Sequence, residues 1–96
     1  MPDWNLVRIR VKSMKAPCEC GHKVGDEWIV GRRAPEGLCI GALENLLPYI
    51  RTLAFNGTFP WATDELDVGT FSCPGPDNPV LYEVKRLPDL AEPPMA

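Results

Sequence analysis

A single segment of this chain, residues 38–54, repeats apolar side chains at the spacing of a helix. The apolar stripe comprises Cys39, Ala42, Leu43, Leu46, Leu47, Ile50 and Leu53. Pro48 lies within the segment, so we expect either a break or kink near Leu47 or the start of a second short helical turn. Because 11 of the 96 residues are proline, the rest of the core has to come from short elements.

Alternating patterns on both sides of this segment predict β-strands. Apolar and basic side chains alternate over residues 6–12, which is typical of a strand with one face on the core and one in water. Residues 80–86 alternate again, and shorter strands are expected at residues 28–30 and 68–73. The order β-β-α-β-β predicts an α+β fold, a small antiparallel sheet or open barrel with one main helix packed on it.

A single domain is expected over residues 1–86, because a chain of 96 residues has enough length for one small core. The last two strands are close enough in sequence to form a hairpin around the Pro- and Gly-rich turn at residues 74–79. Residues 87–96 are rich in proline and are expected to form a flexible tail.

Charge and hydropathy exclude two classes of partner. The net charge is −3 and no basic patch with interleaved aromatic residues occurs, so no nucleic-acid partner is expected. No apolar run approaches the ~20 residues of a membrane helix, and the first residues lack the apolar core of a secretory signal. We therefore expect a cytoplasmic protein with no membrane partner, whose cysteines stay reduced.

The cysteines and the single histidine are the side chains that point to chemistry. Cys18, Cys20 and His22 alternate along a predicted loop, so an extended backbone would place them on one face. Cys39 falls in the first turn of the expected helix and Cys73 at the end of a predicted strand, where ligands from separate segments can meet. Thiolates and imidazole are the ligands that zinc and similar borderline-soft metals prefer.

This pattern predicts a site for zinc or a similar soft divalent metal, whose ligands are Cys20, His22, Cys39 and Cys73. A closed site needs four ligands, so one of the five candidates is a bystander. We assign that role to Cys18, which directly follows Pro17. Four ligands would make the site structural, whereas three would leave a position for water or a substrate, so the sequence leaves open whether the protein is an enzyme.

Two other interpretations of the cysteines stay open. Near a helix N-terminus the helix dipole stabilises a thiolate, so Cys39 with His22 as its base would make a thiol enzyme or a redox sensor. Cys20 or Cys73 would then be the resolving thiol of a disulfide. Cysteine also packs as a small apolar residue, and the position of Cys39 on the apolar stripe suits that role.

A metal-free interaction module is the third hypothesis. Phe59-Pro60-Trp61 reads as an aromatic loop, so the neighbourhood of Phe59 and Trp61 is a candidate site for a small-molecule ligand or an interface. The edge strands of a small sheet can pair with those of a second copy, which makes a homodimer a candidate assembly. The tryptophans are equally suited to the core, because each ring supplies a large buried area.

Several short motifs occur in a fixed order along the chain: Cys20-Gly21-His22 with Gly25-Asp26, Pro35-x-Gly37-Leu38-Cys39, Gly57 with Phe59-Pro60-Trp61, Cys73-Pro74, and Asp77-Asn78-x-Val80 leading to Arg86. With this ordered set the chain resembles a family of small, uncharacterised prokaryotic proteins of similar length. The resemblance spans most of the chain, from the first expected strand to the last. It implies that Cys20, His22, Cys39 and Cys73 belong to one site, and it implies no substrate.

Overall fold

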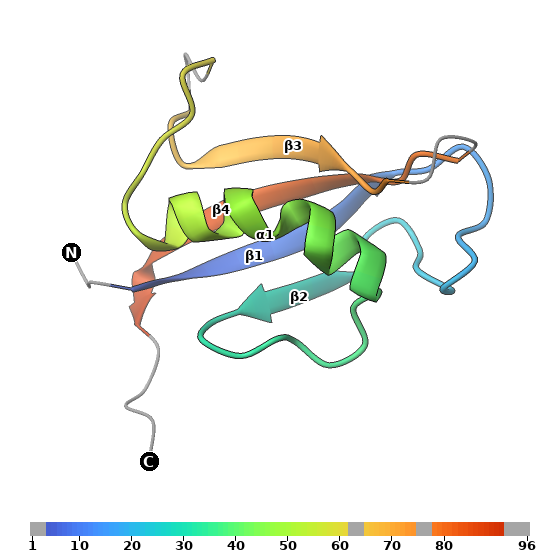
Figure 1. The fold of residues 1–96 in the computed structure, drawn as a ribbon, viewed down its shortest axis with the longest axis horizontal. Helices are drawn as coiled ribbons and strands as arrows, with labels where there is room; N and C mark the ends of the chain where they lie inside the picture. Colours follow the sequence, from blue (N-terminus) through green and yellow to red (C-terminus); the bar gives the residue numbers. More distant parts are fainter. Residues whose placement is uncertain (1–3, 62–64, 75–77, 92–96) are drawn as a thin grey trace.

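The computed structural model describes residues 4–61, 65–74 and 78–91. Its elements in chain order are β1 (Asn5–Ser13), β2 (Glu27–Val30), α1 (Ile40–Ala54), β3 (Val68–Ser72) and β4 (Leu81–Ala91). The strands form one antiparallel sheet in the order β2-β1-β4-β3, and α1 lies across one face of it (Figure 1). The predicted α+β class and the β-β-α-β-β order are confirmed, and the sheet is open rather than closed into a barrel.

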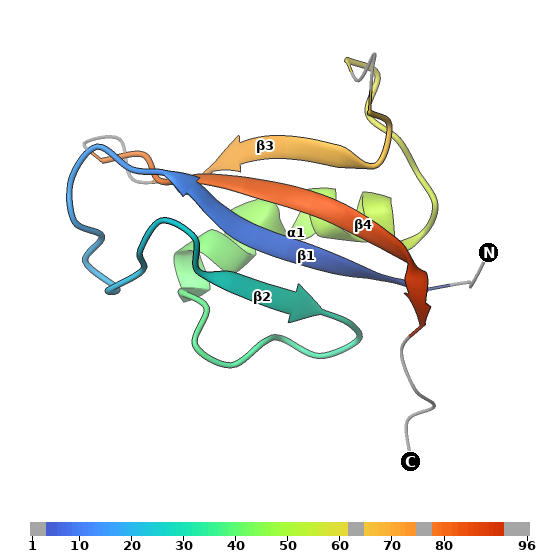
Figure 2. The ribbon, with the colours of Figure 1, turned by 180° about the vertical axis from the view of Figure 1, so that it is seen from behind.

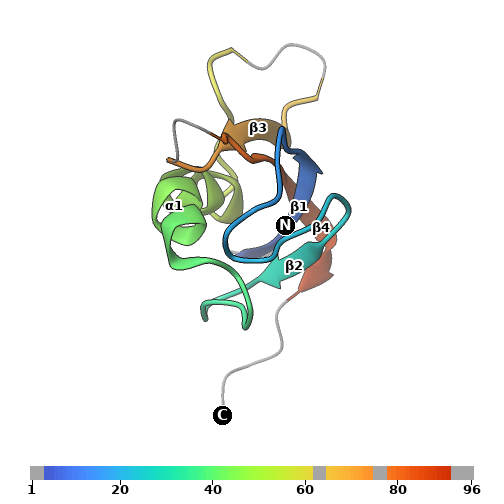
Figure 3. The ribbon, with the colours of Figure 1, turned by 90° about the vertical axis from the view of Figure 1, so that its right-hand side faces the viewer.

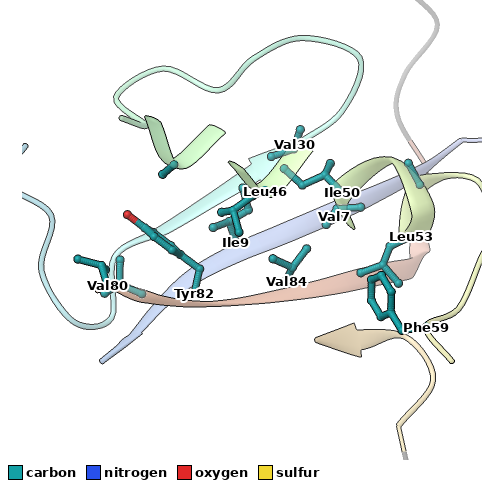
Figure 4. Packing of buried hydrophobic residues seen from close by; sticks show 13 residues of the cluster. Val7, Ile9, Val30, Leu46, Ile50, Leu53, Phe59, Val80, Tyr82 and Val84 are labelled. Carbon is teal, nitrogen blue, oxygen red and sulfur yellow. The ribbon is translucent and has the colours of Figure 1, made fainter. Parts of the chain in front are cut away.

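The described residues form two layers, with α1 on one side of the sheet and no helix of theirs on the other (Figures 2 and 3). Alternation along β1 explains this arrangement, because Val7, Ile9 and Val11 are buried beneath the helix while the basic residues between them are partly exposed. Figure 4 shows the resulting core, which comprises Val7, Ile9, Val11, Val30, Ala42, Leu46, Ile50, Leu53, Ala54, Phe59, Val80, Tyr82 and Val84.

Helix α1 is unbroken, so the predicted break at Pro48 is wrong. Pro48 and Glu44 both lie on the exposed side of the helix, so water can bond to the Glu44 carbonyl that lacks its usual N–H partner. Leu47 was predicted to belong to the apolar stripe, but it is 42% exposed. The helix begins at Ile40, with Cys39 as its N-cap rather than in its first turn. Among the described residues, no helix has the length and hydropathy that crossing a bilayer requires.

Strand β4 continues to Ala91, so the segment predicted as a tail begins as part of the sheet. Pro88 is accommodated within β4 because the pairing with β1 shifts register at this end, where a missing N–H donor is tolerated. The hairpin between β3 and β4 is confirmed by their antiparallel pairing. The rest of the predicted tail, residues 92–96, and residues 75–77 of the predicted turn lie outside the described residues.

Two buried polar side chains of the sheet hold the C-terminal end of α1. Asn5 donates from Nδ2 to the carbonyl of Ala54 (3.1 Å), and Arg86 donates from Nη1 to the carbonyls of Leu53 (3.2 Å) and Gly57 (3.0 Å). The last carbonyls of a helix lack partners within the helix, and a cation is favourable at this end of its dipole. These contacts fix the C-terminal end of α1 on the sheet and so help to place its N-terminus at the opposite end.

Candidate thiol site at the N-terminus of helix α1

Three segments that are far apart in the sequence meet at one end of the sheet. They are the loop between β1 and β2, the first turn of α1 and the segment between β3 and β4 (Figures 1 and 2). All four cysteines of the chain, Cys18, Cys20, Cys39 and Cys73, line one cavity of about 350 Å³ between these segments. Each of them is a free thiol. The fold therefore gathers the thiols of all three segments in one place.

Asn78 holds two of these segments together. Its Oδ1 accepts hydrogen bonds from the backbone N–H groups of Ala16 (2.9 Å) and Lys15 (3.2 Å). Its Nδ2 donates to the carbonyls of Ala16 (2.7 Å) and Pro17 (3.2 Å). The sequence indicated only a turn at this position, so the role of Asn78 was missed. One amide side chain thus ties the β1–β2 loop to the segment before β4.

The single histidine holds the residue at the N-cap of α1. The backbone N–H of Cys39 donates a hydrogen bond to Nε2 of His22 (3.1 Å). The His22 ring is 7% exposed and packs edge-on against Trp28, with ring centroids 4.7 Å apart. This hydrogen bond positions the backbone of Cys39, and it does not join the imidazole to the thiol.

The thiols of Cys39 and Cys20 interact, and their pKa values move in opposite directions. The backbone N–H of Ala42 and the thiol of Cys20 lower the pKa of Cys39 below its usual value of 9.0. The N–H group acts as a dipole at the helix N-terminus, since the Cys39 side chain makes no regular capping hydrogen bond. Contact with Cys39, with smaller effects of desolvation and of Cys18, raises the pKa of Cys20 to about 11. In this pair Cys39 is the hydrogen-bond acceptor and Cys20 the donor.

Two further groups interact with the cysteines or with residues near them, one in the segment before β4 and one in β4 itself. The sulfur of Cys73 accepts a hydrogen bond from the backbone N–H of Val80 (3.4 Å). Tyr82 is buried on β4, and its ring projects from the sheet with the hydroxyl at its outer end (Figure 4). Burial raises the pKa of the Tyr82 hydroxyl, and the nearby cysteines raise it further, so the hydroxyl stays a neutral hydrogen-bond donor. The sequence predicted only an alternating strand at residues 80–86, because alternation along a strand does not show what lies above it.

Four of the five predicted candidates line the same cavity, and the fifth, His22, lines a neighbouring one. Cys18, predicted to be a bystander, lines the cavity together with Cys20, Cys39 and Cys73. His22 lines an adjacent hollow of about 480 Å³, which Cys18 also borders. Within residues 4–61, 65–74 and 78–91, no three His, Cys, Asp or Glu side chains are already arranged to hold a metal ion. The thiols are neighbours that would have to rotate to bind one ion together.

The aromatic loop lies away from the thiol site (Figure 1). Phe59 is buried in the core, whereas Trp61 is 60% exposed and stacks on it with ring centroids 5.1 Å apart. Tyr49 of α1 and Phe71 of β3 stack on each other beside them (3.8 Å). The rings therefore anchor the loop to both layers of the fold. A small-molecule ligand near Phe59 and Trp61 stays a prediction.

Searches against models of protein families, curated protein sequences and solved structures gave no match for this chain. The family resemblance in the sequence motifs therefore stays an expectation. The geometry of the thiol site is the basis for a functional proposal.

Proposed function

We propose that the protein binds zinc or a similar borderline-soft divalent metal ion through its cysteines at the N-terminus of α1. The observation that supports this proposal best is that every cysteine of the chain lines the same cavity. Cysteine occurs only four times in 96 residues and reaches the cavity from three separate segments. Packing of small apolar side chains does not require such a concentration of sulfur.

The surroundings of the thiols suit thiolate ligands. Backbone N–H groups face the sulfurs of Cys39 and Cys73, and such groups stabilise a negative sulfur. Several thiolates in one small cavity repel each other unless a cation lies between them, so a divalent ion would relieve the repulsion. Binding would displace the thiol protons, including the one on Cys20, whose pKa of about 11 otherwise keeps it protonated.

The ligand set that we propose is Cys18, Cys20, Cys39 and Cys73. It differs from the set expected from the sequence in that Cys18 takes the place of His22. Nε2 of His22 accepts the hydrogen bond from the backbone of Cys39, so the imidazole acts as a positioning residue beside the ligands. Four thiolates would close a tetrahedral site with no open position, which indicates a structural role rather than catalysis.

Metal binding can be tested on the full chain, purified under reducing conditions. Elemental analysis should find one zinc per chain, and titration with Co²⁺ should give the visible spectrum of a tetrahedral thiolate site. Cys18→Ser should weaken metal binding by well over 100-fold, because it removes a ligand. His22→Gln should weaken it by about tenfold, the usual effect of losing a group that orients a ligand.

Trp61→Ala is the control, since Trp61 is exposed on the aromatic loop and does not line the cavity. This variant should bind the metal as the parent chain does. If His22→Gln abolishes binding while Cys18→Ser has no effect, the ligand set proposed here is wrong and the one expected from the sequence is right. If the reduced chain binds neither zinc nor Co²⁺, the whole proposal fails.

A further inference from the structure

We propose that Cys39 and Cys20 form an oxidisable dithiol, which a hydroperoxide converts into an intramolecular disulfide. The two thiols line the same cavity, one from the loop between β1 and β2 and the other from the N-cap of α1. The inference concerns the protein without metal, so it does not need the metal-binding function. The inference assigns a redox reaction to the same cysteines that we propose as metal ligands.

The two thiols are placed for different steps of such a reaction. Cys39 is the N-cap residue of α1, where the positive end of the helix dipole favours a thiolate, which suits the thiol that attacks the oxidant. Cys20 is exposed and lines the same cavity, so it can reach the sulfur of Cys39 once that sulfur is oxidised. Gly21, directly after Cys20, has a φ of +82°, and its N–H bonds to the Cys18 carbonyl (2.9 Å) in a tight turn. The turn presents Cys20 at the rim of the cavity.

The other two thiols are less suited to this reaction. The sulfur of Cys73 accepts a hydrogen bond from the backbone N–H of Val80 (3.4 Å). Its thiol also donates a hydrogen bond to the carbonyl of Asn78, with 3.9 Å between sulfur and oxygen. Cys18 is partly buried and packs against the hydrophobic core. A disulfide to either sulfur would have to disturb these contacts. Cys20 and Cys39 therefore form the favoured pair.

The proposed reaction balances with one hydroperoxide per pair. The Cys39 thiolate attacks the outer oxygen, an S–O bond forms as the O–O bond breaks, and the leaving alkoxide takes a proton to become an alcohol. Cys20 then attacks the sulfur of the sulfenic acid, so an S–S bond forms and the S–O bond breaks. The hydroxide that leaves takes the Cys20 proton and becomes water. The two thiols lose two electrons, and the hydroperoxide is reduced to alcohol and water.

The disulfide can be mapped after the purified, reduced chain, with chelator present, has been treated with one equivalent of hydrogen peroxide. Peptide mass spectrometry without reduction should find the Cys20–Cys39 link as the main product. The same oxidation in guanidinium chloride gives the distribution of disulfides in the unfolded chain. The ratio of the Cys20–Cys39 disulfide to all other disulfides should be about tenfold higher in the folded protein than in the unfolded chain.

Two variants separate the roles of the thiols. Cys20→Ala should leave Cys39 as a sulfenic acid that dimedone traps, whereas Cys73→Ala should still form the Cys20–Cys39 link. A product in which another pair predominates, or a pairing no more selective than in guanidinium chloride, would refute the proposal. So would a Cys20→Ala chain that yields no more dimedone adduct than the parent.

One consequence rests on the proposed metal-binding function as well. If the metal uses the same sulfurs, oxidation should release it, and a chromogenic chelator should report up to one ion per disulfide formed. Formation of the disulfide in a chain that never binds metal would support the dithiol and reject the metal site. A chain that binds metal, but forms no Cys20–Cys39 disulfide when it is oxidised after chelation, would support the metal site and reject the dithiol.

Discussion

At the scale of single residues, two cysteines that line one cavity differ in how readily their thiols lose a proton. Cys39 lies where backbone N–H groups of the first helical turn face its sulfur, whereas Cys20 lies on an exposed loop and meets another thiol. The first environment favours the thiolate and the second disfavours it. The difference comes from backbone placement, so the position of each cysteine relative to α1 decides its chemistry.

Alkylation of the reduced, metal-free chain should show this difference directly. The pH midpoint for modification of Cys39 should fall below 9.0, and that of Cys20 should lie near 11. Mass spectrometry of each peptide after brief treatment with iodoacetamide over a pH series measures both. Cys39→Ser should return the midpoint of Cys20 toward 9.0, because its main perturbation is lost. Equal midpoints in the parent chain would contradict this account.

The same shifts fix the sign of their effects on stability. The lowered pKa of Cys39 gives a contribution that is fully present above pH 9.0 and is lost as the pH falls through the folded-state value. The raised pKa of Cys20 gives one that is present below pH 9.0 and is lost as the pH approaches about 11. The two effects therefore oppose each other at alkaline pH.

Sequence reasoning at this scale singled out the cysteines that line the cavity, but not all of their neighbours. Reduced cysteines and a lone histidine are conspicuous because few other side chains bind soft metals. Asn78 and Tyr82 fit ordinary roles in a turn and a core, and their contacts with the site depend on the tertiary fold. That Cys18 lines the same cavity as the other thiols could not be predicted, because a sequence gives no distances between segments.

At the scale of the elements, apolar periodicity was sufficient for the helix, β1 and β4, because burial on one face imposes the pattern. The shorter strands β2 and β3 were predicted as short runs beside turn residues. The residues at which α1 and β4 begin and end depend on tertiary contacts, which the apolar pattern does not reveal. α1 passes through Pro48 because that turn faces water, and β4 passes Pro88 because the register with β1 shifts there. The end of α1 depends on Asn5 and Arg86, whose contacts with the helix arise only in the tertiary fold.

Arg86→Met tests whether the buried guanidinium holds the helix on the sheet. The methionine would fill similar space but leave the carbonyls of Leu53 and Gly57 without this donor. Urea denaturation should show a loss of about 2–3 kcal/mol in the free energy of unfolding, because buried hydrogen bonds to a charged group are lost. Arg10→Met is the control, since Arg10 lies on the open face in a long ion pair with Glu83 (3.6 Å) and should cost less than about 1 kcal/mol. Equal losses in the two variants would show that Arg86 has no special structural role.

At the scale of the whole molecule, the two ends of α1 are supported in different ways. The C-terminal end is fixed by hydrogen bonds from the sheet, whereas the N-terminal end meets two long connections that carry three of the four cysteines. These connections contain no helix or strand among the described residues, and Asn78 supplies most of their mutual hydrogen bonds. A metal ion held by the thiols would give this end the support that Arg86 gives the other.

Hydrogen exchange with and without a chelator should therefore show a local effect of the metal. Removal of the ion should speed amide exchange in residues 14–26, in the first turn of α1 and in residues 73–80, while the β1–β4 ladder keeps its protection. With free metal at about 100 times its dissociation constant, the lost stabilisation would be about 2.7 kcal/mol. Trp61→Ala, far from the thiols, should show the same difference on chelation as the parent chain. Uniform loss of protection would instead mean that the ion supports the whole fold, because a local site cannot weaken a ladder anchored by its own core.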